Sequence, residues 1–529
     1  MKGDFVFMKT WLDNAIVYEI YPQSFYDTNG DGIGDIPGII KKLDYIEECG
    51  FNAIWLNPIN ESSFRDAGYD VTDFYKVDPR YGSNDDYRTL CIKAHERGIK
   101  VIFDLVAGHT SVDHPWFKES SKQEKNEYTN RYIWADGTFD NSQGISGLGE
   151  RDANYIQNFF WSQPALNYGY AHPDPKKPWQ LPVTHPDCVA TKNELKKIID
   201  FWMDMGVDAF RVDLAPSLIK GDTDGSFLNA FWHEIRAHIE SRNPNCLLIA
   251  EWAKPAEAIR AGFHCDFLLH SGNAAYTTLF RHEEGRNTTK SYIGHSYFDK
   301  EGKGNINDYL DRFLYDYRET FGKGVIGMVT GNHDMPRLAY RRTPEEIKAA
   351  MVFLFTMPGV PFVYYGDEIG MDYIEGLPSK EGGYIRTGAR TPMQWNGEKN
   401  HGFSESDCPY LPTDMRENAP TVAAQINDNN SLLSFVRKMI ALRKEYLSLE
   451  PTANFDILMP GYPFVYERSH GAEKLFIAIN PSRYSHHYQM PSIKKVLLSQ
   501  NISFEGERIF MSSVSFLVAE IDITASCKE

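Results

Sequence analysis

The sequence predicts an α/β protein built on a closed (β/α)8 barrel, a TIM barrel, with an inserted domain and a C-terminal antiparallel β-domain. Three observations predict this fold. Short β-branched or aromatic runs alternate with helical patterns through most of the 529 residues. A long stretch without periodicity interrupts this alternation after the third run. Short strand-like runs without intervening helices follow residue 449.

Eight runs are expected to form the parallel strands of the barrel. They lie at residues 16–21, 53–56, 100–105, 209–213, 247–251, 267–269, 325–329 and 361–365. Eight parallel strands, each followed by a helix, are the number that closes such a barrel. Helical spacing at 193–205 and 432–446 is consistent with this alternation. We therefore assign residues 1–106 and 192–448 to the barrel.

The remaining residues are expected to form two smaller domains. Residues 107–191 are rich in Asn, Gly, Pro, Trp and Tyr, and a stretch of this length inside a compact domain is usually functional or a subdomain. We assign them to an inserted domain B. Residues 449–529 contain strand-like runs at 464–468, 474–479 and 514–521, which predict a C-terminal β-sandwich domain.

Composition excludes several classes of function. The formal charge of 55 − 72 = −17 opposes binding to nucleic acid or to anionic lipid. Residues 1–11 lack the apolar core of a signal peptide, and no apolar window of about 18 residues occurs. The seven scattered cysteines include no C-x-x-C pair, which favours reduced thiols. We expect a cytoplasmic protein without membrane contact, either a monomer or a dimer.

Acidic and basic side chains follow the expected strands where a barrel of this type carries its reactive groups. The segments are DLVAGH after the third strand, FRVD at the fourth, IAEW at the fifth and TGNHD after the seventh. The side chains expected to converge there are Asp213, Glu251, Asp334, His109, Arg211 and His333. Crowded acids repel one another, and the resulting split in pKa is what glycoside hydrolysis requires. Separate helix caps or ion pairs are the alternative for each acid.

At these motifs the sequence resembles glycoside hydrolase family 13, the α-amylase family, along nearly its whole length. The segments YEIYPQSF (18–25), GVPFVYYGDE (359–368) and RTPMQW (390–395) carry the resemblance together with the strand-end motifs. The resemblance implies that Asp213 is the nucleophile and Glu251 the general acid and base. It also implies that Asp334 holds ring hydroxyls of the sugar and favours the distorted transition state.

The same resemblance implies binding roles for six further residues. Arg211 would keep Asp213 ionised, because a nearby cation lowers a carboxyl pKa. His109 and His333 would donate to hydroxyls of the glucosyl unit, and Tyr69 would stack beneath that sugar. Asp66 and Arg390 would grip the terminal 4-hydroxyl and close the pocket, which implies exo cleavage. A salt bridge without a substrate role is the alternative for this last pair.

The first loop, DTNGDGIGD at 27–35, supplies alternating oxygen ligands on a glycine turn, as a hard cation requires. It resembles the start of an EF-hand loop but has Gly38 at the twelfth position. In the oligo-1,6-glucosidase-like subgroup the corresponding loop binds calcium. That resemblance implies structural Ca²⁺ held by Asp27, Asn29, Asp31, the Ile33 carbonyl and Asp35. A metal-free Asx turn is the alternative.

Four positions depart from the family pattern. Gly108 stands where the family usually has Asn, so a loop-fixing hydrogen bond is replaced or absent. Ala165 removes a carboxylate from the segment QPALN. Leu214 is expected to narrow the leaving-group side, and Pro216 is similar to the trehalose synthases of the family. These departures leave the three acids intact but predict an unusual leaving-group preference.

Three functions remain open. The first is a retaining exo-α-glucosidase that hydrolyses short maltose-type or isomaltose-type oligosaccharides and needs no organic cofactor. The second passes the glucosyl group to a sugar, as a transglucosylase or a trehalose synthase-like isomerase does. The third is a sugar-binding barrel without catalysis. The linkage, the natural substrate and the chain length remain open as well.

Overall fold

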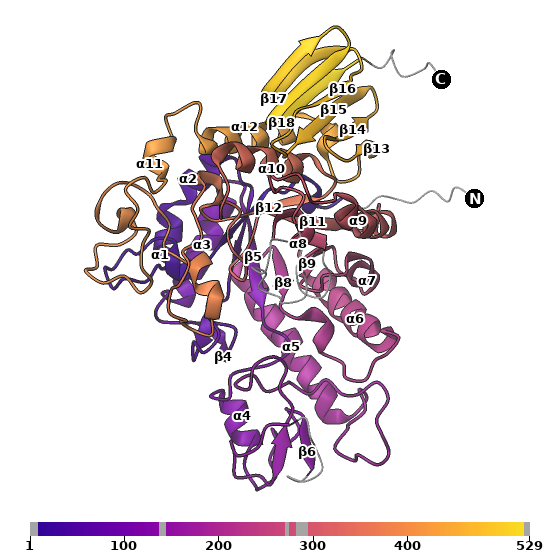
Figure 1. The fold of residues 1–529 in the computed structure, drawn as a ribbon. Helices are drawn as coiled ribbons and strands as arrows, with labels where there is room; N and C mark the ends of the chain where they lie inside the picture. The colour runs from indigo at the N-terminus through magenta and orange to yellow at the C-terminus, as the bar shows by residue number, and fades with distance from the viewer. Residues whose placement is uncertain (1–8, 137–143, 270–274, 282–294, 523–529) are drawn as a thin grey trace.

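A computed structural model of the chain describes residues 9–136, 144–269, 275–281 and 295–522. Its centre is a closed barrel with strand order β1-β12-β11-β10-β9-β8-β5-β2, and the barrel pairs are parallel (Figure 1). The strands are β1 (Val17–Ile20), β2 (Ala53–Leu56), β5 (Lys100–Leu105), β8 (Ala209–Val212), β9 (Leu247–Ala250), β10 (Cys265–Phe267), β11 (Val325–Val329) and β12 (Val360–Tyr364). The predicted fold class is confirmed.

The sixth strand begins earlier than the sequence predicts. We expected it at 267–269, whereas β10 spans Cys265–Phe267. Asp266 lies inside this strand and is fully buried, and its carboxylate accepts hydrogen bonds from the backbone N–H groups of Trp252 and Lys254. A buried acid interrupts the apolar run that signals a strand, which explains the shift.

The helices that surround the barrel begin and end at recognisable caps. Ser83 and Thr343 each form a capping box, and Gly206 ends a helix in the left-handed conformation. The principal helices are α1 (Ile36–Lys41), α2 (Leu43–Cys49), α3 (Asn84–His95), α5 (Pro186–Met205), α6 (Ser226–Arg242), α7 (Pro255–Arg260), α9 (Asn307–Thr320), α10 (Pro344–Thr356) and α12 (Leu432–Glu445).

The segment between β5 and α5 lies where we expected an inserted domain. It contains α4 (Pro115–Ser120) and a two-stranded antiparallel sheet of β6 (Trp134–Asp136) and β7 (Ala153–Tyr155). Figure 1 shows α4 and β6 beyond the end of α5 that lies away from the C-terminal sheet. Helix α5 begins at Pro186, seven residues before the expected 193, because His185 caps it and proline suits its first position.

A further hairpin, which the sequence did not predict, follows β2. Strands β3 (Asn60–Ser62) and β4 (Val71–Val77) pair with irregular register, and the turn between them carries two predicted site residues, Asp66 and Tyr69. Bulged pairing hides the alternation that identifies a strand in a sequence. The hairpin therefore positions part of the site on a short local sheet.

The C-terminal strands form one six-stranded antiparallel sheet rather than two separately hydrogen-bonded sheets. They are β13 (Asn454–Pro460), β14 (Phe464–His470), β15 (Glu473–Asn480), β16 (His486–Gln489), β17 (Ile493–Glu505) and β18 (Arg508–Ile521). The sheet packs on α10 and α12, where Phe516 contacts Phe435 at a ring-centroid distance of 5.6 Å (Figure 1). Side chains are buried on both faces of this sheet, and the antiparallel character expected of the C-terminal domain is confirmed.

Two expectations about the whole chain concern membranes and thiols. Within the described ranges, no helix is both long and apolar enough to cross a bilayer. The six described cysteines are free, and five of them are buried. Cys527 and residues 1–8 of the N-terminal segment lie outside the described residues.

Candidate active site

The three predicted acids follow parallel strands of one barrel and emerge at the same rim. Asp213 comes directly after β8, Glu251 directly after β9, and Asp334 five residues after β11. The neighbouring strand β5 contributes Asp104, which is buried. This rim is where barrels of this class carry their reactive side chains.

One guanidinium group gathers three of the carboxylates. Nη1 of the buried Arg211 lies 2.8 Å from Oδ1 of Asp104 and 3.2 Å from Oδ1 of Asp213. Nη2 of Arg211 lies 3.0 Å from Oε2 of Glu251. The planar fork of arginine fixes the orientation of the carboxylates that it contacts. Asp213 and Glu251 are therefore held side by side.

The backbone also orients Glu251. The N–H of Leu214 donates to Oε2 of Glu251 at 3.0 Å. Leu214 has φ 42° and ψ 44°, the left-handed conformation that a leucine rarely adopts. Backbone strain of this kind concentrates at functional sites. The residue that departs from the family pattern after Asp213 thus contributes a backbone donor to the site.

The pKa of Asp213 is set by its burial and by its charged neighbours. Burial raises the pKa of Asp213 well above its usual range, the charge of Glu251 raises it further, and Arg211 opposes this rise. We expected Arg211 to keep Asp213 ionised. Arg211 does lower the pKa of Asp213, but burial and the charge of Glu251 both raise it. The Arg211 guanidinium contacts both carboxyls and so opposes the repulsion between them.

Arginine side chains also surround Asp334. Its Oδ1 accepts from Nη1 of Arg386 at 2.6 Å and from Nη2 of Arg390 at 3.1 Å. Its Oδ2 lies 3.3 Å from Nε2 of His333. Arg390 in addition donates from Nε to the carbonyl oxygen of His333 at 2.9 Å. The two guanidinium groups therefore fix the orientation of this carboxylate at the rim.

Asp66 forms an ion pair with Arg386. Its Oδ1 lies 3.4 Å from Nη2 of Arg386, and its Oδ2 accepts from Nε2 of Gln163 at 2.8 Å. Burial raises the pKa of Asp66 to about 6. Arg386 thus bridges Asp66 and Asp334, whereas the joint role of Asp66 and Arg390 at a terminal 4-hydroxyl stays a prediction. Sequence reasoning missed Arg386 and Gln163 because both lie in segments without regular periodicity.

Tyr69 connects the two groups of acids. Its hydroxyl lies 3.0 Å from Oδ2 of Asp104 and 3.0 Å from Nε2 of His333. Its ring stacks on His333 at a centroid distance of 5.4 Å and an interplanar angle of 16°. Arg211 contacts Asp104, Asp104 contacts Tyr69, and Tyr69 contacts His333. These contacts connect the carboxylates around Arg211 with those beside His333. All nine predicted catalytic and substrate-binding residues apart from the calcium loop are thus linked within one site.

The two histidines of the site are buried and neutral. Burial lowers the pKa of His109 to about 4 and that of His333 to about 3. Nε2 of His109 lies 3.0 Å from the carbonyl oxygen of Tyr69. At neutral pH both rings can therefore donate and accept hydrogen bonds without carrying charge.

The predicted calcium loop is closed by its own backbone. The two carboxylate oxygens of Asp27 accept from the N–H groups of Asn29, Gly30 and Gly32 at 2.8–3.0 Å. Oδ1 of Asn29 accepts from Asp31 N, and Oδ1 of Asp31 accepts from Ile33 N. These are the Asx turns that the metal-free alternative requires, and they leave further oxygen lone pairs for a cation.

Asp35 fits the cation least well of the expected ligands. Its Oδ1 caps α1 by accepting from Gly38 N at 2.7 Å, and its Oδ2 accepts from the N–H and hydroxyl of Thr28. In the described part of the chain, no cluster of three or more His, Cys, Asp or Glu side chains is arranged to hold a metal. Any cation here would depend on amide and carbonyl oxygens as well as Asp27 and Asp31.

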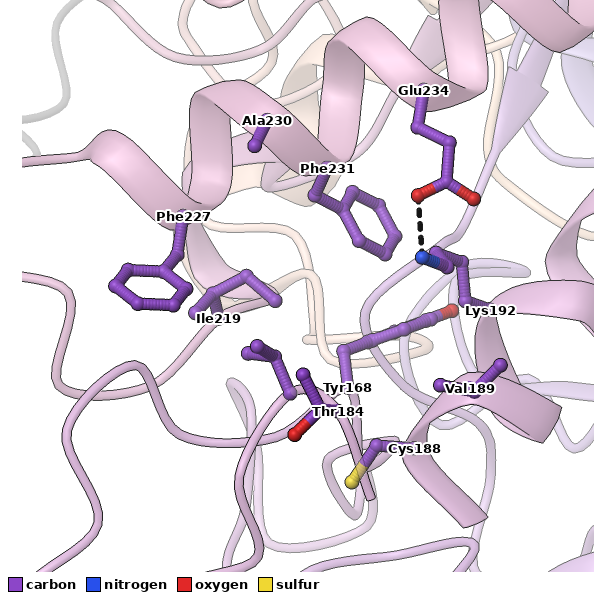
Figure 2. A pocket seen from close by; sticks show the side chains of 11 residues that line it. Tyr168, Thr184, Cys188, Val189, Lys192, Ile219, Phe227, Ala230, Phe231 and Glu234 are labelled. Atoms are coloured by element: carbon purple, nitrogen blue, oxygen red, sulfur yellow. Dashed lines mark hydrogen bonds and ion pairs between the residues drawn. The ribbon is translucent and has the colours of Figure 1, made fainter. Parts of the chain in front are cut away.

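A separate apolar pocket lies between α5 and α6. Figure 2 shows Ile219, Phe227, Phe231 and Tyr168 around it, with one ion pair between Lys192 and Glu234. Glu234 is the single acid among its lining residues. The pocket therefore lacks the paired carboxylates of the barrel rim.

Comparisons with known proteins agree with this geometry. Residues 19–451 match the family described as "Alpha amylase, catalytic domain". An oligo-1,6-glucosidase of Heyndrickxia coagulans is 31% identical over 94% of this chain and 97% of its own length. A trehalose synthase of Thermus thermophilus is 30% identical over 91% of this chain and 51% of its own. A solved isomaltulose synthase variant from Erwinia rhapontici NX5 has a TM-score of 0.81 over 97% of this chain and 100% of that chain at 24% identity, which bears on the fold alone.

Proposed function

The chain belongs to the α-amylase family, glycoside hydrolase family 13, and from this membership we propose that it is a retaining exo-acting α-glucosidase that hydrolyses short α-glucosides. The observation that carries the proposal is that Asp213 and Glu251 both contact the fork of Arg211, at 3.2 Å and 3.0 Å. Carboxyls that share one guanidinium lie near one another, as the two acids of a retaining glycosidase do, whereas an inverting glycosidase separates its acids to admit a water molecule.

In the first step, Glu251 gives its proton to the glycosidic oxygen while the bond from that oxygen to the anomeric carbon breaks. A carboxylate oxygen of Asp213 forms a bond to the anomeric carbon, and the leaving sugar departs with the proton. In the second step, Glu251 takes a proton from water, whose oxygen bonds to the anomeric carbon as the bond to Asp213 breaks. Two inversions give α-glucose and restore Glu251.

The other predicted residues bind the sugar in this proposal. Asp334 holds the ring hydroxyls, the neutral rings of His109 and His333 hydrogen bond to hydroxyls, and Tyr69 packs against the sugar. Asp66 and Asp334 are bridged by Arg386, and this polar wall is suited to closing the pocket behind one terminal glucose. Exo cleavage follows from a closed wall. We further propose that the enzyme acts in the cytoplasm on small oligosaccharides.

Replacing Glu251 by glutamine tests the proposal. E251Q keeps the size of the side chain but removes the transferable proton, so we expect kcat on 4-nitrophenyl α-glucoside to fall by about 10²–10⁴-fold. Mass spectrometry should detect the glucosyl-enzyme, because the base for the second step is missing. E234Q, in the separate pocket, is the matched control. Turnover of E251Q near the parental rate would refute the assigned role.

Because the chain is 30% identical to a trehalose synthase, transfer of the glucosyl group to a second sugar is the second candidate reaction. Water and a second sugar differ only as acceptors of the glucosyl group. Chromatography of products from maltose, isomaltose, trehalose, sucrose and maltotriose distinguishes them. From maltose, free glucose as the sole product supports hydrolysis. Trehalose or longer oligosaccharides from maltose would instead show that the enzyme is a transglucosylase, and the proposal would fail.

We also propose that the loop at 27–35 binds Ca²⁺ as a structural ion. A bound cation stabilises the native state according to its affinity, so excess EDTA should lower Tm while kcat at 25 °C stays unchanged. D31A should abolish this response, because Asp31 supplies a ligand from the exposed side of the loop. An identical Tm in EDTA and in millimolar Ca²⁺ would favour the metal-free Asx turns.

A further inference from the structure

Gly108 makes room for a side chain from the inserted segment. A Cβ atom at position 108 would lie 2.7 Å from Nδ2 of Asn158 and 2.9 Å from Oγ of Ser217. Both distances are shorter than normal carbon contacts, so the amide of Asn158 occupies the space into which a side chain at 108 would project. The departure from the family pattern at Gly108 is thus matched by Asn158, which lies 50 residues later in the chain.

The hydrogen bonds of Asn158 have only one consistent direction. Its Oδ1 lies 3.1 Å from Nζ of Lys220, and an ammonium group only donates. The amide NH2 must therefore face the other way, where Nδ2 lies 3.1 Å from Oγ of Ser217 and 3.1 Å from Nδ1 of His109. Lys220 is itself held by the carbonyl oxygen of Ser217 at 2.6 Å.

This direction decides which nitrogen of His109 carries the ring proton. Nδ1 faces the amide donor and must accept, so the proton lies on Nε2, which donates to the carbonyl oxygen of Tyr69 at 3.0 Å. The low pKa of His109, caused mainly by burial, agrees with a neutral ring. Under the proposed function, a sugar hydroxyl would share this Nε2–H with the carbonyl oxygen of Tyr69.

We propose that Lys220 and Asn158 are positioning residues that lock His109 in its Nε2–H tautomer, in a cluster that requires glycine at position 108. This inference rests on the proposed function, because it assigns the cluster to sugar binding through His109. The second partner of a histidine commonly fixes its tautomer and orientation. Here that partner comes from the inserted segment rather than from the residue before His109.

Packing behind the cluster restrains both of its ends. The hydroxyl of Tyr168 donates to the carbonyl oxygen of Ala107 at 2.7 Å, directly beside Gly108. Ile219, the neighbour of Lys220, packs with Tyr168 in the apolar pocket between α5 and α6 (Figure 2). Tyr168 thus lies beside both the segment that carries Gly108 and the neighbour of Lys220, and such packing keeps the rotamers around a site fixed.

The test uses N158A, N158D, K220M and G108A, with the double variant G108A/N158A. N158D is nearly isosteric and keeps the contact to Lys220, but its carboxylate cannot donate to Nδ1 and therefore favours the opposite tautomer. We expect kcat/KM on 4-nitrophenyl α-glucoside to fall about tenfold in N158A and K220M, as for lost outer-shell partners. N158D should lose more activity than N158A and should become pH-dependent, because a carboxylate raises the pKa of a histidine.

The double variant G108A/N158A tests whether the amide of Asn158 occupies the space beside Gly108. G108A should lose activity alone, whereas G108A/N158A should be no worse than N158A, because removing the amide relieves the contact. The matched controls are N130A, whose amide contacts Asp187 in the same region, and K196M, whose ammonium contacts Glu234 on the surface. Both controls should keep parental kcat and KM.

The outcomes separate this inference from the proposed function. Equal activity of N158D and the parent, or additive losses in G108A/N158A, would overturn the inference while hydrolysis by the parent stands. A purely structural amide predicts a smaller loss for the isosteric N158D than for N158A, which would also overturn it. If the parent hydrolyses no α-glucoside, the proposed function fails. The tautomer assignment is then tested independently by the ¹⁵N chemical shifts of His109 in the parent and in N158D, and the same tautomer in both proteins would contradict it.

Discussion

Glu19 shows how one buried acid can control a neighbouring histidine. It is fully buried on β1, and its Oε1 lies 3.0 Å from Nδ1 of His333 and 3.2 Å from Nδ2 of Asn57. Burial raises the pKa of Glu19 well above its usual range. A neutral Glu19 donates to Nδ1 of His333, and the ring proton then lies on Nε2, which faces Asp334 and Tyr69.

Substitution of Glu19 tests this assignment. E19Q keeps a neutral donor of the same shape, so we expect kcat and Tm to stay close to the parental values. E19L removes the donor and leaves Nδ1 of His333 with only Asn57, so we expect kcat to fall about tenfold or more. Steady-state kinetics and thermal unfolding measure both effects. Equal losses in E19Q and E19L would show that the negative charge of Glu19 is required.

At the residue scale, the sequence predicts the side chains that follow regular strands and misses those on irregular segments. Asp213 and Glu251 could be found because each ends a clear apolar run. Arg386 and Asn158 could not, because their partners lie far away in the chain and their own segments have no period. Glu19 lies in a predicted strand, but its contact with His333 depends on its burial in the folded barrel and could not be predicted from the sequence.

At the element scale, a short helical turn after β12 connects three parts of the barrel. Glu368 lies in η4 (Asp367–Ile369) and is fully buried. Its Oε1 accepts from the hydroxyls of Tyr18 on β1 at 2.7 Å and Tyr45 on α2 at 2.8 Å. Within the described residues its Oε2 has no hydrogen-bond partner. Burial raises the pKa of Glu368 to about 7.

This raised pKa predicts a stability that depends on pH. The pKa in the unfolded chain is about 4.3, so the native state binds the proton more tightly, and the contribution of Glu368 is complete at low pH and is lost as pH rises through 7. Relative to E368Q, the parent should therefore lose stability between pH 5 and 8, on the order of 3 kcal/mol. Thermal unfolding of both proteins at these pH values measures the difference.

The exposed Glu417 supplies the control for this measurement. E417Q should follow the parent across the whole range, because an exposed carboxyl keeps similar surroundings in the folded and unfolded chains. If E368Q and the parent change in parallel from pH 5 to 8, Glu368 does not hold a proton in the native state.

The positions of elements were predictable where local signals are strong. The expected helix at 432–446 matches α12 within one residue at its C-terminal end, and a serine caps its start. The β3–β4 hairpin was missed because its irregular pairing hides the period of two. The early start of β10 reflects Asp266, whose burial is set by backbone donors from a neighbouring loop. Tertiary contacts, rather than local propensity, decide such elements.

At the scale of the whole molecule, the barrel and the C-terminal sheet share one core. Helix α10 is buried on nearly all sides because it lies beside the C-terminal sheet. The buried Arg468 of β14 donates to the carbonyl oxygens of Thr356 and Glu450, each at 2.6 Å. Phe353 and Phe464 meet at a centroid distance of 6.1 Å across the same junction. Apolar and polar contacts both tie the sheet to the barrel.

Removal of the sheet should therefore destabilise the barrel itself. A chain that ends at residue 452 would expose the apolar side chains of α10, and uncovered patches of this kind cause association. We expect this truncated chain to elute as aggregates in size-exclusion chromatography. Because the sheet and the barrel share one core, we expect the full chain to unfold in a single calorimetric transition. R468A should lower Tm, since it leaves the buried carbonyl group of Thr356 and the part-buried one of Glu450 without this donor. A monomeric truncated chain with parental Tm and kcat would show instead that the barrel folds independently of the sheet.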